Sequence, residues 1–114
     1  MTKPPYIPSA GDIIWLVLDP RVGHEQSGRR PAIVLSPKLF TERTGLAIIA
    51  PITSNAKELP FEIALTKTKT TGVILPIHVR SVDVTSRKAK LIEKVPKSML
   101  TKVRRYIALM IEVE

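Results

Sequence analysis

The sequence predicts a mainly β protein, a short-stranded sheet that curls into a small barrel and is followed by one C-terminal α-helix. Several short apolar runs are separated by polar, proline- or glycine-containing stretches, a pattern typical of strands and turns. Near the C-terminus the apolar spacing changes to three and four residues, which is typical of one face of a helix. Because 114 residues suffice for one compact core, we expect a single domain over residues 1–114.

The elements follow in order along the chain. Residues 1–10 are proline-rich and aperiodic, so we expect a flexible N-terminal arm. Strands are expected at 13–18, 31–35 and 46–52, with a turn or a single helical turn at 37–44. Pro51 in the third strand favours an edge, an end or a bulge there. Shorter strands are expected at 61–65, 73–75, 77–84 and 89–95, with a polar hairpin at 66–72.

The C-terminal helix is expected to begin at Pro96, because proline suits the first turn of a helix. Its apolar stripe is expected to pack on the barrel or to form a dimer contact. The stripe consists of Met99, Leu100, Val103, Tyr106, Ile107, Met110 and Ile111.

Composition excludes several classes of chemistry. The absence of cysteine excludes disulfides and thiolate sites, and with only two histidines we expect no metal site and no cofactor. No apolar stretch reaches membrane-spanning length and no signal peptide is visible, so a cytoplasmic protein is expected. A net charge of +8 predicts a polyanionic partner, nucleic acid or an acidic protein, although the basic excess between residues 80 and 105 could instead be a solvated face.

The loop at 23–31 is the first candidate site, because it concentrates polar side chains between two strands. Arg30 directly precedes Pro31, so its guanidinium is expected to leave the sheet from a defined position. Such a guanidinium can bind a phosphate bidentately and stabilise charge that develops on a phosphorane. A structural ion pair with Glu25 is the alternative. The other polar side chains of the loop are His24, Gln26 and Arg29.

Two further stretches carry candidate residues. After the third strand, Thr53 and Ser54 could donate hydrogen bonds to a phosphate and Lys57 could attract an anionic backbone, or the hydroxyls could simply form a turn. In the expected strand at 77–84, alternation puts His78 and Arg80 on one side, where they could line a groove. A structural, hydrogen-bonded role is the alternative for His78.

Taken together, these stretches resemble the MazF/PemK toxin family, and the resemblance covers nearly the whole chain from Gly11 onward. An opening Gly-Asp-x-x-Trp followed by Gly-His-Glu-Gln and Arg-Pro is far more specific in combination than any of its parts. The matching segments are Gly11-Asp12-Ile13-Ile14-Trp15, Gly23-His24-Glu25-Gln26, Arg30-Pro31, Pro51-Ile52-Thr53, Pro60-Phe61-Glu62, Thr71-Gly72-Val73 and Val79-Arg80-Ser81-Val82-Asp83.

The resemblance implies an SH3-like β-barrel of the MazF/PemK/CcdB type, a homodimer, and the toxin of a type II toxin–antitoxin system. The implied activity is sequence-specific, ribosome-independent and metal-independent cleavage of single-stranded mRNA, which inhibits translation and growth. A cognate acidic antitoxin of the MazE/PemI type is the implied partner.

The family's catalytic arginine and threonine fall on Arg30 and Thr53, and Glu25 is carried over as a residue of the site loop. In this chemistry the ribose 2′-hydroxyl attacks the adjacent phosphate and leaves a 2′,3′-cyclic phosphate and a 5′-hydroxyl, so DNA is spared. Arginine is a poor proton acceptor, so the general base is Glu25, His24 or no side chain. The expected RNA-binding residues are His24, Gln26, Arg29, Ser54, Lys57, His78 and Arg80.

The chain departs from the family pattern in one segment. Ile77 and His78 stand where relatives commonly have an acidic residue followed by glutamine, and Leu75 stands where some have arginine. His78 could therefore change base preference or supply an acid.

Two other functions remain open from the sequence. A CcdB-like toxin would poison DNA gyrase without cutting RNA. An inert RNA-binding barrel would need aromatic side chains on which bases stack. The chain has five aromatic residues, Tyr6, Trp15, Phe40, Phe61 and Tyr106. Most of them lie in apolar runs that predict core positions, so few aromatic side chains are expected to be available for stacking.

Overall fold

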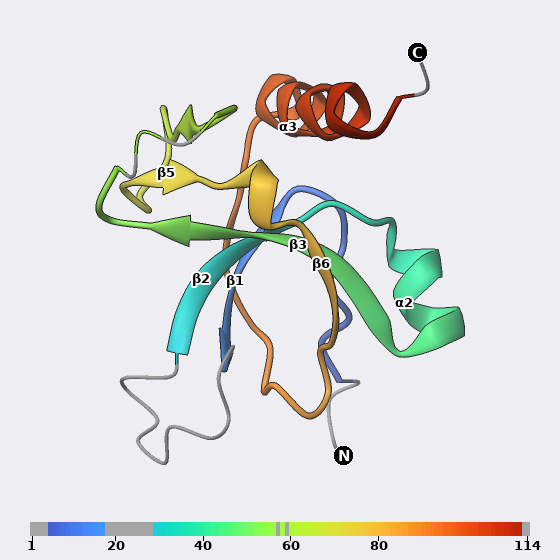
Figure 1. Cartoon of the computed structure of the whole chain (residues 1–114). Helices are drawn as coiled ribbons and strands as arrows, with labels where there is room; N and C mark the ends of the chain where they lie inside the picture. Colours follow the sequence, from blue (N-terminus) through green and yellow to red (C-terminus); the bar gives the residue numbers. More distant parts are fainter. Residues whose placement is uncertain (1–4, 18–28, 57, 59, 113–114) are drawn as a thin grey trace.

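A computed structural model describes residues 5–17, 29–56, 58 and 60–112, and these residues form a strongly curled β-sheet with an α-helix across one end (Figure 1). The mainly β fold with a C-terminal helix, as predicted, is confirmed. The strands are β1 (Asp12–Val17), β2 (Arg29–Val34), β3 (Leu46–Thr53), β4 (Ile63–Ala64), β5 (Val73–Ile74), β6 (Arg80–Asp83) and β7 (Lys90–Lys94). The helices are α2 (Lys38–Thr44), the short 3-10 helix η2 (Pro76–His78) and α3 (Lys97–Ile111).

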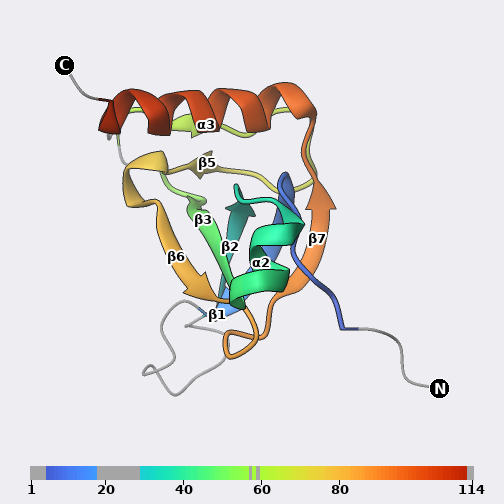
Figure 2. The same cartoon turned by 90° about the vertical axis from the view of Figure 1, so that its right-hand side faces the viewer.

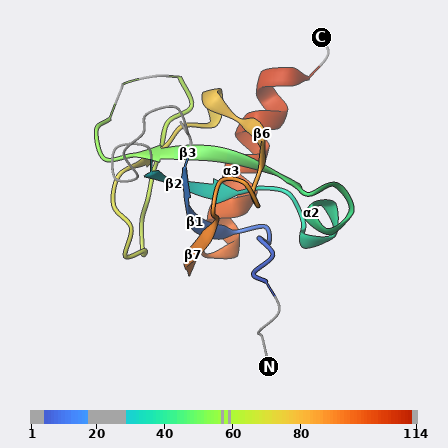
Figure 3. The same ribbon diagram turned by 90° about the horizontal axis from the view of Figure 1, so that it is seen from below.

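The long strand β3 organises the sheet. The strand order is β4-β5-β3-β2-β1-β7, all neighbours are antiparallel, and β6 pairs separately with β3. One edge of β3 pairs with β6 over Leu46–Ile49 and then with β5 over Ile52–Thr53, so the sheet turns around this strand (Figure 2). The β4–β5 hairpin and α2 therefore lie at opposite ends of β3 (Figure 3).

Pro51 lies inside β3, between its pairings with β6 and with β5. Its missing N–H therefore interrupts no ladder, and its carbonyl accepts a hydrogen bond from the Leu75 N–H at 2.9 Å. In place of the edge, end or bulge expected at Pro51, the structure has a gap along one edge of β3, between the residues that pair with β6 and those that pair with β5.

Strand alternation gives the sheet two apolar faces, each with its own cluster of buried residues. The helix-side cluster includes Met99 and Val103 of α3 and is completed by Ile13, Ile33, Leu35, Ala50, Ile52, Ile63 and Ile74. The opposite cluster consists of Ile14, Leu16, Ala32, Val34, Ala47, Ile49, Val82 and Val84. Successive residues of β1 thus belong to opposite faces, as the pattern of a two-sided buried strand requires.

Both helices begin after a proline and differ slightly from expectation. The turn expected at 37–44 is the seven-residue helix α2, which Gly45 ends in the left-handed conformation (φ 75°) while its N–H donates to the Thr41 carbonyl. Pro96 is the N-cap of α3 and not its first helical residue. The predicted stripe packs on the core as far as Ile107, whereas Ile111 is 73% exposed.

Two expected strands are shorter than the apolar pattern indicated. At 61–65 the strand is only Ile63–Ala64, and it begins late because Phe61 has a positive φ of 66° that strand geometry does not allow. The strand expected at 77–84 begins only at Arg80, since Pro76 starts the 3-10 helix that contains His78. The expectation that His78 and Arg80 share one side of a strand was therefore wrong.

The N-terminal segment is attached to the sheet from Tyr6 onward. Asp12 is fully buried and accepts hydrogen bonds from the Tyr6 hydroxyl, from the Ser9 N–H at 3.0 Å and from the Lys94 ammonium at 2.7 Å. Because a buried carboxylate is unfavourable unless it is paired, these bonds connect the arm, β1 and β7. In the part of the chain that the structure describes, no helix has the length and apolarity needed to cross a membrane.

Candidate nucleic-acid groove

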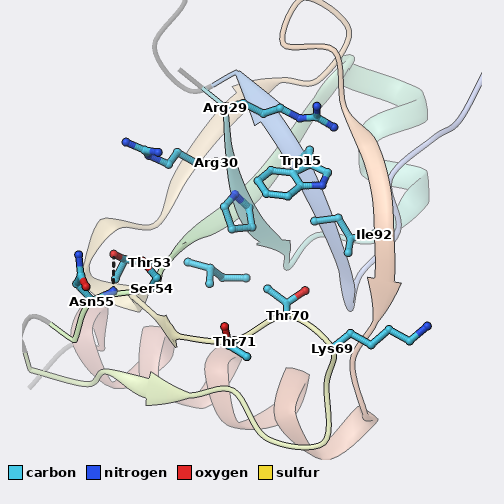
Figure 4. A pocket seen from close by; sticks show the side chains of 12 residues that line it. Trp15, Arg29, Arg30, Thr53, Ser54, Asn55, Lys69, Thr70, Thr71 and Ile92 are labelled. Atoms are coloured by element: carbon cyan, nitrogen blue, oxygen red, sulfur yellow. Dashed lines mark hydrogen bonds between the residues drawn. The ribbon is translucent and has the colours of Figure 1, made fainter. Parts of the chain in front are cut away.

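A groove of about 1120 Å³ opens at the ends of β2 and β3 (Figure 4). Its lining combines basic, hydroxyl and apolar side chains from five parts of the sequence. The residues are Trp15 of β1, Arg29, Arg30 and Pro31 of β2, Ile52 to Asn55 at the end of β3, Lys69 to Thr71 of the β4–β5 turn, and Ile92 of β7.

The apolar part of the groove continues the sheet face that carries the helix-side cluster. Across β1 and β2, Ile13 lies opposite Ile33 in that cluster, and the next residues on the same face are Trp15 and Pro31, which also lie opposite each other. Trp15 and Pro31 both line the groove, so a ligand in the groove can contact the side chains that lie directly beside the helix-side cluster.

Arg30 and Thr53 come from neighbouring antiparallel strands. The register pairs Ala32 with Pro51, and continuing it by two residues brings Arg30 opposite Thr53. Both side chains line the groove and lie toward the same side of it in Figure 4. The Thr53 hydroxyl accepts a hydrogen bond from the Asn55 N–H at 3.2 Å, which is the expected turn chemistry. Among the described residues this hydroxyl has no acceptor for its own proton, and a hydroxyl can donate as well as accept.

The groove is positively charged and holds several hydroxyls. Its cations are Arg29, Arg30 and Lys69, and no carboxylate of the described chain is among the lining residues. Thr53, Ser54, Thr70 and Thr71 contribute hydroxyls. Arginine, lysine and hydroxyl side chains are the usual donors to phosphate oxygens, so the lining fits a phosphodiester backbone.

Glu93 of β7 holds the β4–β5 turn in place. Its carboxylate accepts hydrogen bonds from the Lys69 N–H at 3.0 Å and from the Thr70 N–H and hydroxyl, both at 2.7 Å. Burial raises the pKa of this carboxyl, but these hydrogen bonds and the Lys69 charge outweigh burial and hold the pKa below its usual value. The turn that forms one wall of the groove is thereby attached to β7.

Gly72 follows that turn and lies directly against the backbone of β3. It has φ +122°, and a Cβ atom there would lie 2.2 Å from the Thr53 carbonyl oxygen. Only glycine allows this close approach, which helps to position Thr53.

The structure brings together four of the residues expected from sequence: Arg29, Arg30, Thr53 and Ser54 line the groove. His78 and Arg80 are exposed and do not line it, because β6 pairs with the half of β3 that lies away from the groove. Four further expected residues, His24, Glu25, Gln26 and Lys57, lie outside the described residues, so the Arg30–Glu25 ion pair stays open. No described carboxylate pairs with Arg30.

Sequence reasoning missed the apolar bed of the groove and its third cation. Trp15 is half-buried in the groove although it lies in an apolar run, so the expectation of a core position does not hold for it. Lys69 and Thr70 were expected only as part of a polar hairpin. Both line the groove while Glu93 of β7 accepts hydrogen bonds from their N–H groups, a contact that no local pattern indicates.

Most basic residues between 80 and 105 that have described contacts serve structure. The Arg87 guanidinium donates to the Val17 carbonyl at 2.9 Å, Lys94 pairs with Asp12, and Arg104 donates twice to the Leu35 carbonyl, at 3.0 and 2.6 Å. The groove draws its cations from other segments, so the late basic excess and the groove are separate features. The described residues contain no cluster of three acidic or histidine side chains placed to bind a metal ion.

A small curled β-sheet with a cationic, hydroxyl-lined groove at its strand ends defines a barrel protein whose site suits a polyanion. Residues 9–111 match the model of the PemK-like, MazF-like toxins of type II toxin–antitoxin systems, and the chain belongs to this family.

Relatives agree in sequence and in fold. The protein named Endoribonuclease toxin MazF from Escherichia coli (strain K12) is 43% identical over 77 residues, which cover 68% of this chain and 69% of the relative. The crystal structure of MazF (Form-I) from Deinococcus radiodurans superposes with a TM-score of 0.82 at 43% identity, over 93% of this chain and 97% of that one. A MazE-MazF crystal structure (Form-III) from the same organism gives 0.83 at 40% identity, over 92% and 96%.

Proposed function

We propose that the protein is a toxin endoribonuclease that binds single-stranded mRNA in the groove and cleaves it without a metal ion and without the ribosome. The observation that carries the proposal is the meeting of Arg30 and Thr53 at the ends of adjacent strands, in a groove lined by two further cations. The printed name of the Escherichia coli relative, an endoribonuclease toxin, supports the reaction class.

The reaction is an internal transesterification. The 2′-oxygen of the ribose bonds to the adjacent phosphorus, and the bond from phosphorus to the 5′-oxygen of the next nucleotide breaks. The 2′-hydroxyl loses its proton and the leaving 5′-oxygen gains one, so the products are a 2′,3′-cyclic phosphate and a 5′-hydroxyl with no net proton change.

In this scheme the Arg30 guanidinium stabilises the negative charge that builds up on the phosphorane oxygens. The Thr53 hydroxyl donates a hydrogen bond to a phosphate oxygen or orients the 2′-hydroxyl, and Ser54 assists in binding the backbone. The proposed proton acceptor is Glu25, His24 or no side chain, because arginine is a poor base.

The proposed biological setting is a cytoplasmic toxin, acting as a homodimer and held inactive by an acidic antitoxin. The net charge of +8 and the cationic groove favour an acidic partner that covers the groove. The Deinococcus radiodurans relative was crystallised as a MazE-MazF complex, which supports this kind of partner.

The test is cleavage of one long single-stranded RNA and of its DNA counterpart in EDTA, with mapping of the ends. Wild-type protein should give discrete cuts in RNA alone, with cyclic phosphate and 5′-hydroxyl ends. Arg30→Ala should lower the rate about 100- to 1000-fold, the usual effect of removing a group that stabilises an oxyanion. Thr53→Val, which keeps the shape of the side chain, should lower it about 10- to 100-fold.

Arg43→Ala is the matched control, because Arg43 is an exposed arginine in the last turn of α2, outside the groove. It should cleave like wild type. Intact RNA with the wild-type protein, or full activity of Arg30→Ala, would contradict the proposal. Intact RNA together with broken DNA in growth-arrested cells would point to gyrase.

A further inference from the structure

Trp15 is a large aromatic side chain that the fold leaves at the groove surface. Its neighbours Ile14 and Leu16 are fully buried on the opposite face of β1, and Ile13 is fully buried in the helix-side cluster. Trp15 follows Ile13 on the same face but lies outside that cluster, half-buried and lining the groove.

The Trp15 ring is covered by the side chain of an exposed arginine. The Arg29 guanidinium carbon lies 4.9 Å from the ring centroid, a cation–π contact between diagonal neighbours on β1 and β2. Arg29 is exposed, and no described carboxylate pairs with it. Displacing the guanidinium therefore breaks no buried ion pair within the described residues.

The surroundings of the ring are suited to a flat apolar group. Pro31 lies opposite Trp15 in the strand register and lines the groove with it. Ile92 lies near Trp15, whereas Arg30 and Thr53 lie toward the other side of the groove (Figure 4). An apolar bed next to phosphate-binding groups has the two parts needed for one nucleotide: a surface for the base and donors for the phosphate.

We propose that Trp15 is a stacking platform for one base of the bound RNA, and that Arg29 leaves the ring to bind the phosphate beside that base. The inference rests on the proposed function, because it assumes that the groove takes single-stranded nucleic acid. Stacking on an aromatic side chain contributes about 1–3 kcal/mol per base and tolerates different bases. The stacked base would fix the position of the RNA strand along the groove, so that the next phosphate lies within reach of Arg30 and Thr53.

Trp15 is the only tryptophan of the chain, so its fluorescence reports on stacking directly. The probe is a random-sequence pool of short single-stranded oligodeoxynucleotides, which lack the 2′-hydroxyl and cannot be cleaved by this chemistry. The matched control is an abasic phosphodiester chain of equal length and charge. The oligonucleotides should quench the fluorescence, and the abasic chain should leave it nearly unchanged. Equal quenching by both would overturn the proposal.

Variants distinguish the contributions of Trp15 and Arg29 to binding. With a labelled pool and anisotropy as the readout, Trp15→Leu should weaken binding about 5- to 150-fold, whereas Trp15→Phe should stay within a few-fold of wild type. Arg29→Ala should keep the base-dependent quenching but lower the slope of log Kd against log salt by about 0.7, as expected for one phosphate contact. Wild-type affinity in Trp15→Leu, or loss of quenching in Arg29→Ala, would overturn the proposal.

These outcomes are distinguishable from failure of the proposed nuclease activity. If wild-type protein leaves RNA whole but shows base-dependent quenching that is retained in Arg29→Ala, the stacking site stands and the nuclease does not. If RNA is cleaved while the oligonucleotides leave Trp15 unquenched, the stacking site alone falls. Circular dichroism of each variant establishes that it is folded, and Trp15→Phe and Arg29→Ala keep the test decisive if Trp15→Leu does not fold.

Discussion

Gly72 lies so close to Thr53 that the geometry of a proposed catalytic residue depends on the absence of one methyl group. In Gly72→Ala the new Cβ would meet the Thr53 carbonyl oxygen at 2.2 Å and its carbonyl carbon at 2.9 Å. The backbone of β3 must shift, so we predict loss of most cleavage activity together with a lower melting temperature. Strain of this kind costs about 1–3 kcal/mol.

Gly45→Ala is the control for the strain of a positive φ alone. Gly45 has φ +75° but no atom within 4 Å of the added Cβ, and it lies at the end of α2 away from the groove. It should cost about 1–2 kcal/mol and leave the cleavage rate of the folded protein unchanged. Thermal unfolding and initial cleavage rates measure both effects, and equal activity of the two variants would contradict a positioning role for Gly72.

At the scale of elements, the β4–β5 turn depends on β7 through Glu93. The lowered pKa of this carboxyl means that its ionised form stabilises the folded state. That stabilisation is fully present above the unfolded-state value near 4.5 and is lost as the pH falls through the lower folded-state value. Glu93→Gln has no charge to lose, so we predict that it melts below wild type at neutral pH and that the difference shrinks in acid.

The measurement is the melting temperature of both proteins from neutral pH to about pH 3, below the ordinary carboxyl pKa. Cleavage at neutral pH should also fall in Glu93→Gln, because Lys69 and Thr70 lose their anchor. Glu42→Gln, an exposed change in α2, serves as the control. A gap between wild type and Glu93→Gln that stays constant with pH would show that the carboxylate charge does not hold the turn.

For the whole molecule, we expect the distribution of charge to influence binding more than the total of +8 does. Lys69 lines the groove, whereas the guanidinium of Arg104 in α3 donates two hydrogen bonds to the Leu35 carbonyl. We predict that Lys69→Ala lowers the salt dependence of oligonucleotide binding by about 0.7 in log–log slope, the share of one phosphate contact. Arg104→Ala should lower the melting temperature and leave that slope unchanged.

The paired measurement is a salt titration of binding together with thermal unfolding of each variant. Lys97→Ala, which removes an exposed charge at the start of α3, should change neither quantity much. If all three variants lowered the slope equally, the net charge of the protein would govern binding in place of the groove.

The sequence by itself determined the fold class and the order of the elements, because alternation and helical spacing are local properties of the chain. The buried strands β1, β2 and β3 and the stripe of α3 agree closely with their patterns. The positions of Arg30 and Thr53 at the beginning and the end of apolar strands were also readable, whereas their catalytic roles come from the family resemblance and stay a prediction. Patterns were least informative where backbone conformation overrides polarity, as at Phe61 and in the 3-10 helix that contains His78.

Only the tertiary structure decided which of these residues share a site. Period-two alternation puts Trp15 on the same face as Ile13, but only the packing of α3 determines where the helix-side cluster ends and the groove begins. The switch of β3 from β6 to β5 excludes Arg80 from the groove lining, and the Glu93 contact brings Lys69 to it. Each of these results depends on contacts between residues far apart in the chain, which local periodicity does not encode.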